Sequence, residues 1–245
     1  AYEFTPAAGN VDGYVYGGRA QQWVGDHVRF GATGAVEKTG SADQNLAGAD
    51  VQIYKSERTF LEAEVATSEG PGFGFFQSID GGLTMTDPTV AGESGKRALA
   101  YRVLTRADLS EVIPGLKGDL QANYAYKQKG FSTLDEQVTD NEQEWGLKGD
   151  LDLTERLTLD LYYAQQNIED GSFDGKGGAG LTYQLTRNLA VTGGVEHAAM
   201  NDPGQNEQGD RTDAALRLEQ TISEDMSGAE KVGPFFAQKK FANLP

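Results

Sequence analysis

Residues 116–163 alternate between apolar and polar side chains with a period of two, and this alternation is the strongest constraint on the fold. A period of two puts successive side chains on opposite faces of a β-strand. The runs match the roughly 9–11 residues that a tilted strand needs to cross a bilayer. The stretch therefore predicts amphipathic strands with one apolar and one charged face. Its apolar-face positions are Leu116, Gly118, Leu120, Ala122, Tyr124, Tyr126, Trp145, Leu147, Gly149, Leu151, Leu153, Leu157, Leu159, Leu161 and Tyr163.

The composition narrows the function classes. The chain is acidic, with a formal net charge of -16, which opposes binding to nucleic acid because an anionic surface repels phosphates. It contains no cysteine, which excludes thiolate zinc sites, thiol catalysis and disulfides. No apolar run approaches the ~20 residues of a membrane helix. Residues 1–4 lack the basic start of a signal peptide, so we expect either a cleaved leader or a piece of a longer chain.

The same alternation recurs on both sides of the central stretch. Residues 1–12 are expected to form an irregular lead-in, and residues 13–245 to form one β-domain of about 12–14 strands. Within 13–24 the register is ambiguous, because aromatic and aliphatic residues stand at both parities. Further strands are expected within 28–37, 49–54, 61–67, 99–108, 181–186, 189–196 and 216–222, with weaker ones at 82–86 and 232–238.

The expected connections alternate between short and long. Short turns are expected near Asp26, Arg58, Pro114, Glu155 and Arg187. Long loops are expected near Ser41, Phe75, Glu136, Gly175 and Gln205. A transmembrane β-barrel has this asymmetry, with short periplasmic turns and long extracellular loops. The aromatic residues expected at the long-loop end of the apolar face, as an interfacial girdle would be, are Tyr124, Tyr126, Trp145 and Tyr163.

Through hairpins such as 115–127 and 145–166, the chain resembles a bacterial outer-membrane β-barrel protein. The resemblance implies a closed antiparallel transmembrane barrel in a Gram-negative outer membrane. Lipid, lipopolysaccharide and other outer-membrane or surface proteins would be its partners. Barrel chains of this class commonly end on a strand with a terminal aromatic residue, whereas Phe241 here is followed by residues 242–245. Two interpretations stay open: the chain is the barrel segment of a larger surface protein, or its last residues are not the true terminus.

The polar positions of the strands supply the candidate functional residues. We expect them to line a hydrated lumen whose charges tune the passage of ions or solutes. The alternative is a charge-paired interior that is plugged or too narrow to conduct, since charge does not fix a radius. The expected lumen-facing residues are Arg29, Glu62, Glu64, Arg102, Arg106, Lys117, Asp119, Lys148, Asp150, Asp152, Asp160, Glu196, Arg217 and Glu219.

Other chemistry has little support in the sequence. Asp170, Ser172 and Asp174 resemble the first half of a calcium loop, but the twelfth position is Leu181 rather than a bidentate glutamate, so a plain acidic loop competes with this interpretation. The two histidines, His27 and His197, show no serine and carboxylate in a triad arrangement. We therefore expect no enzyme activity and no cofactor.

The favoured prediction is a passive outer-membrane channel for small hydrophilic solutes or ions. One alternative is a non-conducting membrane anchor or component of a larger cell-surface assembly. The other is a soluble secreted β-sandwich or adhesin module, because alternation also fits a sheet whose apolar face turns to a core.

Overall fold

The computed structural model of the chain describes residues 13–38, 43–70, 95–133 and 138–221. It also gives the backbone of three short strands: β1 (Tyr2–Phe4), β6 (Phe76–Ser78) and β14 (Ala237–Lys240). β1 lies within the segment expected to be an irregular lead-in and pairs with β6 in a two-stranded sheet. The strand expected at 82–86 lies outside the described residues, and of that expected at 232–238 only the part within β14 is described.

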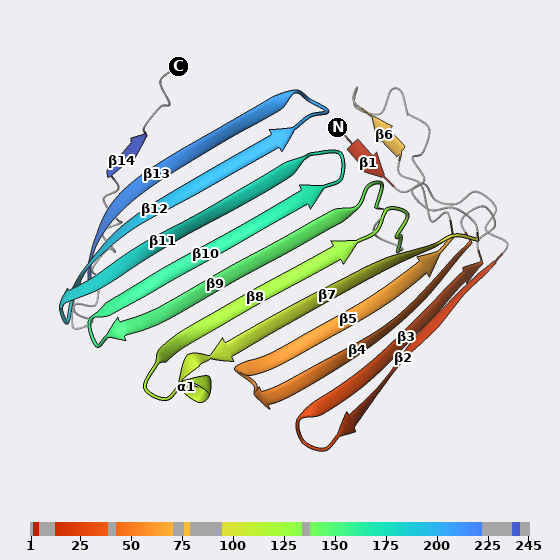
Figure 1. Cartoon of the computed structure of the whole chain (residues 1–245), viewed down its shortest axis with the longest axis horizontal. Helices are drawn as coiled ribbons and strands as arrows, with labels where there is room; N and C mark the ends of the chain where they lie inside the picture. Colours follow the sequence, from red (N-terminus) through yellow and green to blue (C-terminus); the bar gives the residue numbers. More distant parts are fainter. Residues whose placement is uncertain are drawn as a thin grey trace, which may run out of the picture. The chain divides into compact units, whose positions relative to one another are not determined.

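The long strands form one antiparallel sheet, as the alternation predicts. They are β2 (Tyr14–Val24), β3 (Val28–Lys38), β4 (Gln44–Ser56), β5 (Thr59–Glu69), β7 (Arg97–Asp108), β8 (Lys117–Lys127), β9 (Glu142–Thr154), β10 (Leu157–Ile168), β11 (Phe173–Thr186), β12 (Leu189–Asp202) and β13 (Glu207–Gln220). They follow chain order in a twelve-stranded sheet that starts at β2 and ends at β14 (Figure 1). The all-β antiparallel prediction is confirmed.

The chain divides into two compact units. Unit 1 comprises residues 1–104, 124–143 and 168–170, and unit 2 comprises 105–123, 144–167 and 171–245. Each unit is described by itself below.

Hydroxyl side chains close several of the tight turns. Ser56 Oγ accepts hydrogen bonds from the backbone N–H groups of Arg58 (3.1 Å) and Thr59 (3.0 Å). The Thr154 hydroxyl accepts from Arg156 N (3.2 Å), and the Thr186 hydroxyl accepts from Asn188 N (3.3 Å). Each of the three hydroxyl residues ends its strand, so a serine or threonine at that place satisfies turn N–H groups that the sheet leaves free.

The predicted pattern of short turns and long loops is wrong at three connections. β10 ends at Ile168 and β11 begins at Phe173, so the loop expected near Gly175 is strand. Likewise only residues 203–206 separate β12 from β13, where a long loop was expected near Gln205. The connection expected to be a short turn near Pro114 instead contains helix α1 (Leu109–Val112), which is N-capped by Asp108 accepting from Ser110 N (3.0 Å). The longer connections at the predicted loop end are 39–43, 70–96 and 128–141.

The glycines of β11 explain the error in that region. Gly177 and Gly178 lie under the rings of Tyr163 and Tyr162, where a Cβ would come within 2.8 Å of either ring. Glycine usually weakens a strand, but here its missing side chain makes room for an aromatic neighbour. The sequence run therefore has the composition of a loop and the structure of a strand.

Candidate functional site

Burial across the sheet of unit 1 is the reverse of that in a water-soluble protein. Asp50 and Gln52 on β4 are buried, with Asp50 only 7% exposed. Phe30 on the opposite face of β3 is 51% exposed. Asp50 and Gln52, on the polar side of these strands, are covered by neighbouring side chains, while large apolar residues on the other side are exposed to solvent. We call the first side the ionic face and the second the apolar face.

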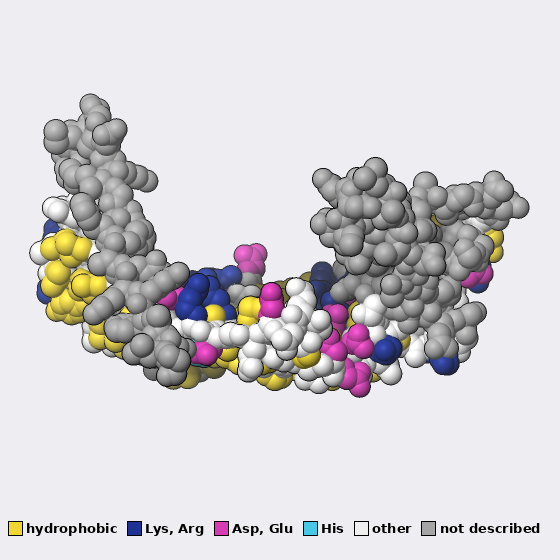
Figure 2. Space-filling model, turned by 90° about the horizontal axis from the view of Figure 1, so that it is seen from above, with side chains coloured by type: hydrophobic (Ala, Val, Ile, Leu, Met, Phe, Trp, Pro, Cys, Tyr) yellow, Lys and Arg dark blue, Asp and Glu magenta, His cyan; other side chains and the backbone are white. Residues whose placement is uncertain are grey.

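Unit 2 also exposes large apolar side chains on one face of its strands. The strand registers bring Leu159, Leu181 and Leu216 into one cross-sheet row with Gly193, and Leu216 is 62% exposed. Tyr183, Val195 and Leu218 on this apolar face are also exposed. In Figure 2, charged side chains stand above the centre of the sheet, and hydrophobic side chains lie mainly along its lower margin at the left and centre. Large apolar patches of this kind mark surfaces that meet an apolar partner.

Ion pairs and hydrogen bonds cross the ionic face of unit 1. Arg19 on β2 reaches Asp50 on β4 at 2.6 Å and donates to the Thr33 hydroxyl at 2.8 Å. Gly31 of the intervening β3 makes room for this contact, because a Cβ there would overlap the Asp50 carboxylate. Each charge is therefore balanced by a neighbour on a nearby strand, as a shielded charge requires.

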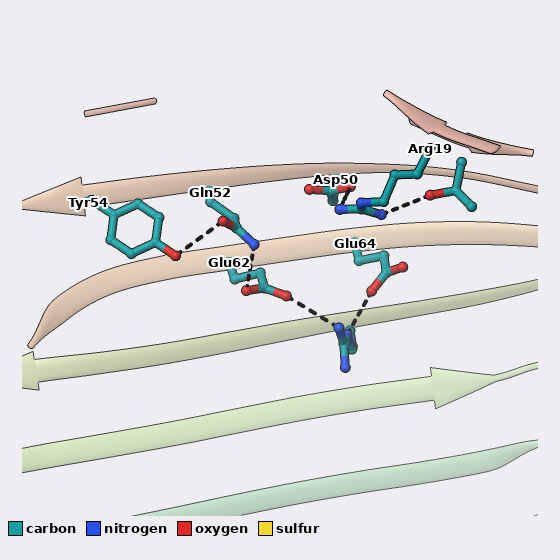
Figure 3. Close-up of polar contacts among 8 residues, drawn as sticks. Arg19, Asp50, Gln52, Tyr54, Glu62 and Glu64 are labelled. Carbon is teal, nitrogen blue, oxygen red and sulfur yellow. Dashed lines mark hydrogen bonds and ion pairs between the residues drawn. The ribbon is translucent and has the colours of Figure 1, made fainter. Parts of the chain in front are cut away.

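A second group of contacts on this face centres on Arg102. The guanidinium lies 3.3 Å from Glu62 and 2.8 Å from Glu64. Gln52 donates to Glu62 at 2.8 Å and accepts from the Tyr54 hydroxyl at 3.1 Å. Figure 3 shows the labelled members of both groups projecting from the same side of the strands. They are Arg19, Asp50, Gln52, Tyr54, Glu62 and Glu64.

The ionic face of unit 2 has its own centre at Glu196 on β12. Its carboxylate accepts a hydrogen bond from the Tyr162 hydroxyl and lies 3.2 Å from Lys176 and 3.5 Å from Arg211. Arg211 also pairs with Asp213 at 2.7 Å. Three neighbouring strands thus contribute to one charge-balanced cluster, with Tyr162 reaching it from β10.

Apart from Lys117, the predicted lumen-facing residues fall on the ionic faces. Those of unit 1 are Arg29, Glu62, Glu64 and Arg102. Those of unit 2 are Arg106, Asp119, Lys148, Asp150, Asp152, Asp160, Glu196, Arg217 and Glu219. Lys117 is the first residue of β8, next to Gly118, whose φ is 137°. Among the residues on the ionic faces, Arg106 pairs with Asp119 at 3.2 Å and Arg217 with Glu219 at 3.1 Å. Asp150 and Asp160 lie against each other, with Lys148 beside them.

Several members of these clusters are absent from the prediction. Arg19 was missed because the parity of β2 is ambiguous in the sequence. Lys176, Arg211 and Asp213 were missed because their segments were interpreted as loops or loop ends. A signal was nevertheless present, since Lys176 has the same parity as Thr182, which was predicted on the polar side of that strand.

The aromatic residues divide between the faces. On the apolar face of unit 1, the ring of Tyr101 lies 5.9 Å from Tyr124 and 5.3 Å from Tyr126, which adds Tyr101 to the predicted girdle. In unit 2, Tyr163 on β10 shares the apolar-face parity of Leu161, and Trp145 on β9 shares that of Leu147.

A second aromatic group lies on the ionic face of unit 1 and was not predicted. There Trp23 contacts Tyr54 at 5.8 Å, and Tyr54 contacts Phe60 at 5.5 Å. These residues adjoin the tight turns at 25–27 and 57–58.

The loop on which the calcium prediction depends is not formed. Asp170 and Ser172 lie in the connection 169–172, but Asp174 is already part of β11, opposite Gln166 and Met200. In the part of the chain that the structure describes, no cluster of three or more His, Cys, Asp or Glu residues could hold a metal ion.

The chain matches no protein-family model, no curated protein and no solved structure significantly. Among the described residues, no helix is long and apolar enough to cross a membrane.

Proposed function

We propose that the chain forms a transmembrane β-barrel, or a large part of one, in a bacterial outer membrane, and that it provides a passive route for small hydrophilic solutes or ions. The observation that carries the proposal is the two-sided sheet, with paired charges on one face and exposed leucines, valines and tyrosines on the other. In water such an apolar face costs roughly 25 cal/mol for each Å² left exposed, whereas hydrocarbon removes that cost.

Strand length supports the membrane as the apolar partner. The long strands contain 11 residues in β3 and β8 and 14 residues in β11, β12 and β13. A tilted strand needs about 9–11 residues to cross the hydrocarbon. The strands are therefore long enough to span a bilayer and to extend beyond it. The cluster of Tyr101, Tyr124 and Tyr126 suits the polar boundary of such a layer.

The ionic face suits contact with water. Charged groups in hydrocarbon are costly, and membrane proteins turn them toward one another or toward a hydrated cavity. The pairs around Arg102 and Glu196 place opposite charges next to one another while leaving the face polar. Outer-membrane lipid and lipopolysaccharide would contact the apolar face and its margins. The edges of β2 and β14 would pair on closure, or with further strands of a larger assembly, because hydrocarbon cannot satisfy free strand edges.

A membrane anchor without conduction is the second candidate. It is favoured by the segment 128–141, part of which packs on the ionic face of unit 1. A secreted β-sandwich is disfavoured, because its leucines would be covered by a second layer rather than exposed.

The proposal is tested by purification and reconstitution. Extraction should require detergent, gel mobility should change on heating, and the protein should produce discrete conductance steps in planar bilayers. Conductance would favour the channel over the anchor. A protein that stays dissolved without detergent and shows no heat-dependent mobility would contradict both.

A further inference from the structure

The connection between β8 and β9 contains several of the most deeply buried residues that the structure describes in unit 1. Ser132 and Val138 have 0% exposure, and Phe131 is also buried. Phe131 and Val138 form an apolar cluster with Ala98, against which Leu46, Ala66 and Ala100 pack. These four partners come from β4, β5 and β7 and have the parity of the ionic face. Phe131, Ser132 and Val138 therefore cover part of the ionic face at one end of the strands.

Polar contacts fasten the segment to that face. The backbone N–H of Ser132 donates to Ser68 Oγ on β5 at 2.9 Å. Gln44 on β4 donates to the Ser132 hydroxyl at 2.7 Å and also to the Ser132 carbonyl. Ser68 and Gln44 are themselves buried, so losing these contacts would leave buried polar groups unsatisfied.

The segment is also held together internally. Gly130 N donates to the Val138 carbonyl at 2.8 Å, and Val138 N donates to the Phe131 carbonyl at 2.9 Å. Lys129 N donates to the Asn141 side chain at 2.7 Å, and Asn141 donates to Glu169 at 2.7 Å. These bonds brace residues 129–131 against residues 138–141.

We propose that residues 128–133 and 138–141 of this connection form a fixed constriction at their end of the passage, which limits it to small solutes and ions. The inference rests on the proposed function, because it assigns to the ionic face the role of a passage wall. Phe131 and Val138 cover part of that face with an apolar cluster. Its buried contacts favour a permanent narrowing over a lid that swings open.

Chemical labelling tests the burial without reference to conduction. The chain has no cysteine, so single cysteines can be introduced without background. Ser132→Cys should react with a membrane-impermeant maleimide at least about tenfold more slowly than Lys129→Cys, whose native side chain is 62% exposed in the same segment. Equal rates would show that the segment detaches, and would overturn a fixed constriction.

Conductance tests the narrowing. The variant Gln44→Ala/Phe131→Ala/Ser132→Ala, which removes the contacts of the segment, should raise single-channel conductance by about twofold or more and admit larger polyethylene glycols. Phe30→Ala, on the apolar face, is the matched control and should conduct like the wild type. In both variants, heat-dependent gel mobility establishes that the barrel is folded.

A crosslink separates a fixed element from a moving one. Oxidised Ser68→Cys/Ser132→Cys should conduct like its reduced form, because the segment already lies in place. A fall in conductance on oxidation would mean that the segment moves, which contradicts the proposal.

The triple-alanine variant separates the constriction from the channel. If this variant is folded and conducts no better than a conducting wild type, the constriction is refuted and the channel stands. If neither conducts, both proposals fail.

Discussion

Tyr162 on β10 donates a hydrogen bond to Glu196 on β12 by crossing over the glycine of the strand between them. The register places Tyr162 opposite Gly178 and Gly178 opposite Glu196. A comparable crossing joins Arg19 to Asp50 in unit 1, where Gly31 leaves the space. Glycines in this sheet thus allow long polar side chains to link next-nearest strands along the ionic face.

Gly178 should consequently tolerate no side chain. In Gly178→Val, the new Cβ would lie 2.8 Å from the Tyr162 ring and 2.9 Å from the Val195 carbonyl. We expect a loss of about 1–3 kcal/mol in the free energy of unfolding, as for other overpacked sites. Urea unfolding in lipid vesicles or detergent measures it. Gly180→Val, on the same face of β11, has only contacts of 3.9 Å or more and should cost clearly less. Equal losses of unfolding free energy in the two variants would contradict the crossing of Tyr162 over Gly178.

The two kinds of arginine pair should differ in stability. Arg19→Met removes the partner of Asp50, whose side chain is 3% exposed, and should cost about 2–4 kcal/mol because a shielded carboxylate loses its cation. Arg97→Met breaks a pair with Glu69 whose arginine is 77% exposed, and should cost about 0–1 kcal/mol. Unfolding of the two variants under identical conditions gives the comparison. A smaller loss for Arg19→Met than for Arg97→Met would be inconsistent with the described network.

Ala214 and Ala215 on β13 offer a matched test of the two faces. Both are exposed, but Ala214 pairs with Val195 on the apolar face and Ala215 pairs with Gly194 on the ionic face. If the apolar face meets hydrocarbon, Ala214→Lys should cost about 2–4 kcal/mol of folding free energy in vesicles. Ala215→Lys should stay within about 0.5 kcal/mol, as exposed polar sites do. Two small and equal effects would place both faces in water.

The sequence predicts the strands well where the alternation is uninterrupted. Leu157, Leu159 and Leu161 reveal both the strand and the side of the sheet on which they lie, because a strand has only two faces. It fails where a residue's role depends on a neighbour distant in sequence. Gly178 looks like a loop glycine until Tyr162 lies over it. The burial of Ser132 depends on Ser68 and Gln44, which no local pattern connects to it.

The most direct measurement is the environment of spin labels on adjacent positions of opposite faces. Labels at Leu120, Leu151 and Leu159 are compared with labels at Asp119, Asp150 and Asp160, which are their neighbours in β8, β9 and β10. Relaxation by oxygen, which concentrates in hydrocarbon, and by a water-soluble nickel complex separates lipid from water. In reconstituted vesicles, the account predicts fast oxygen relaxation at the three leucine positions and nickel access at the three aspartate positions. Nickel access at the leucine positions, or oxygen-dominated relaxation at the aspartate positions, would contradict it.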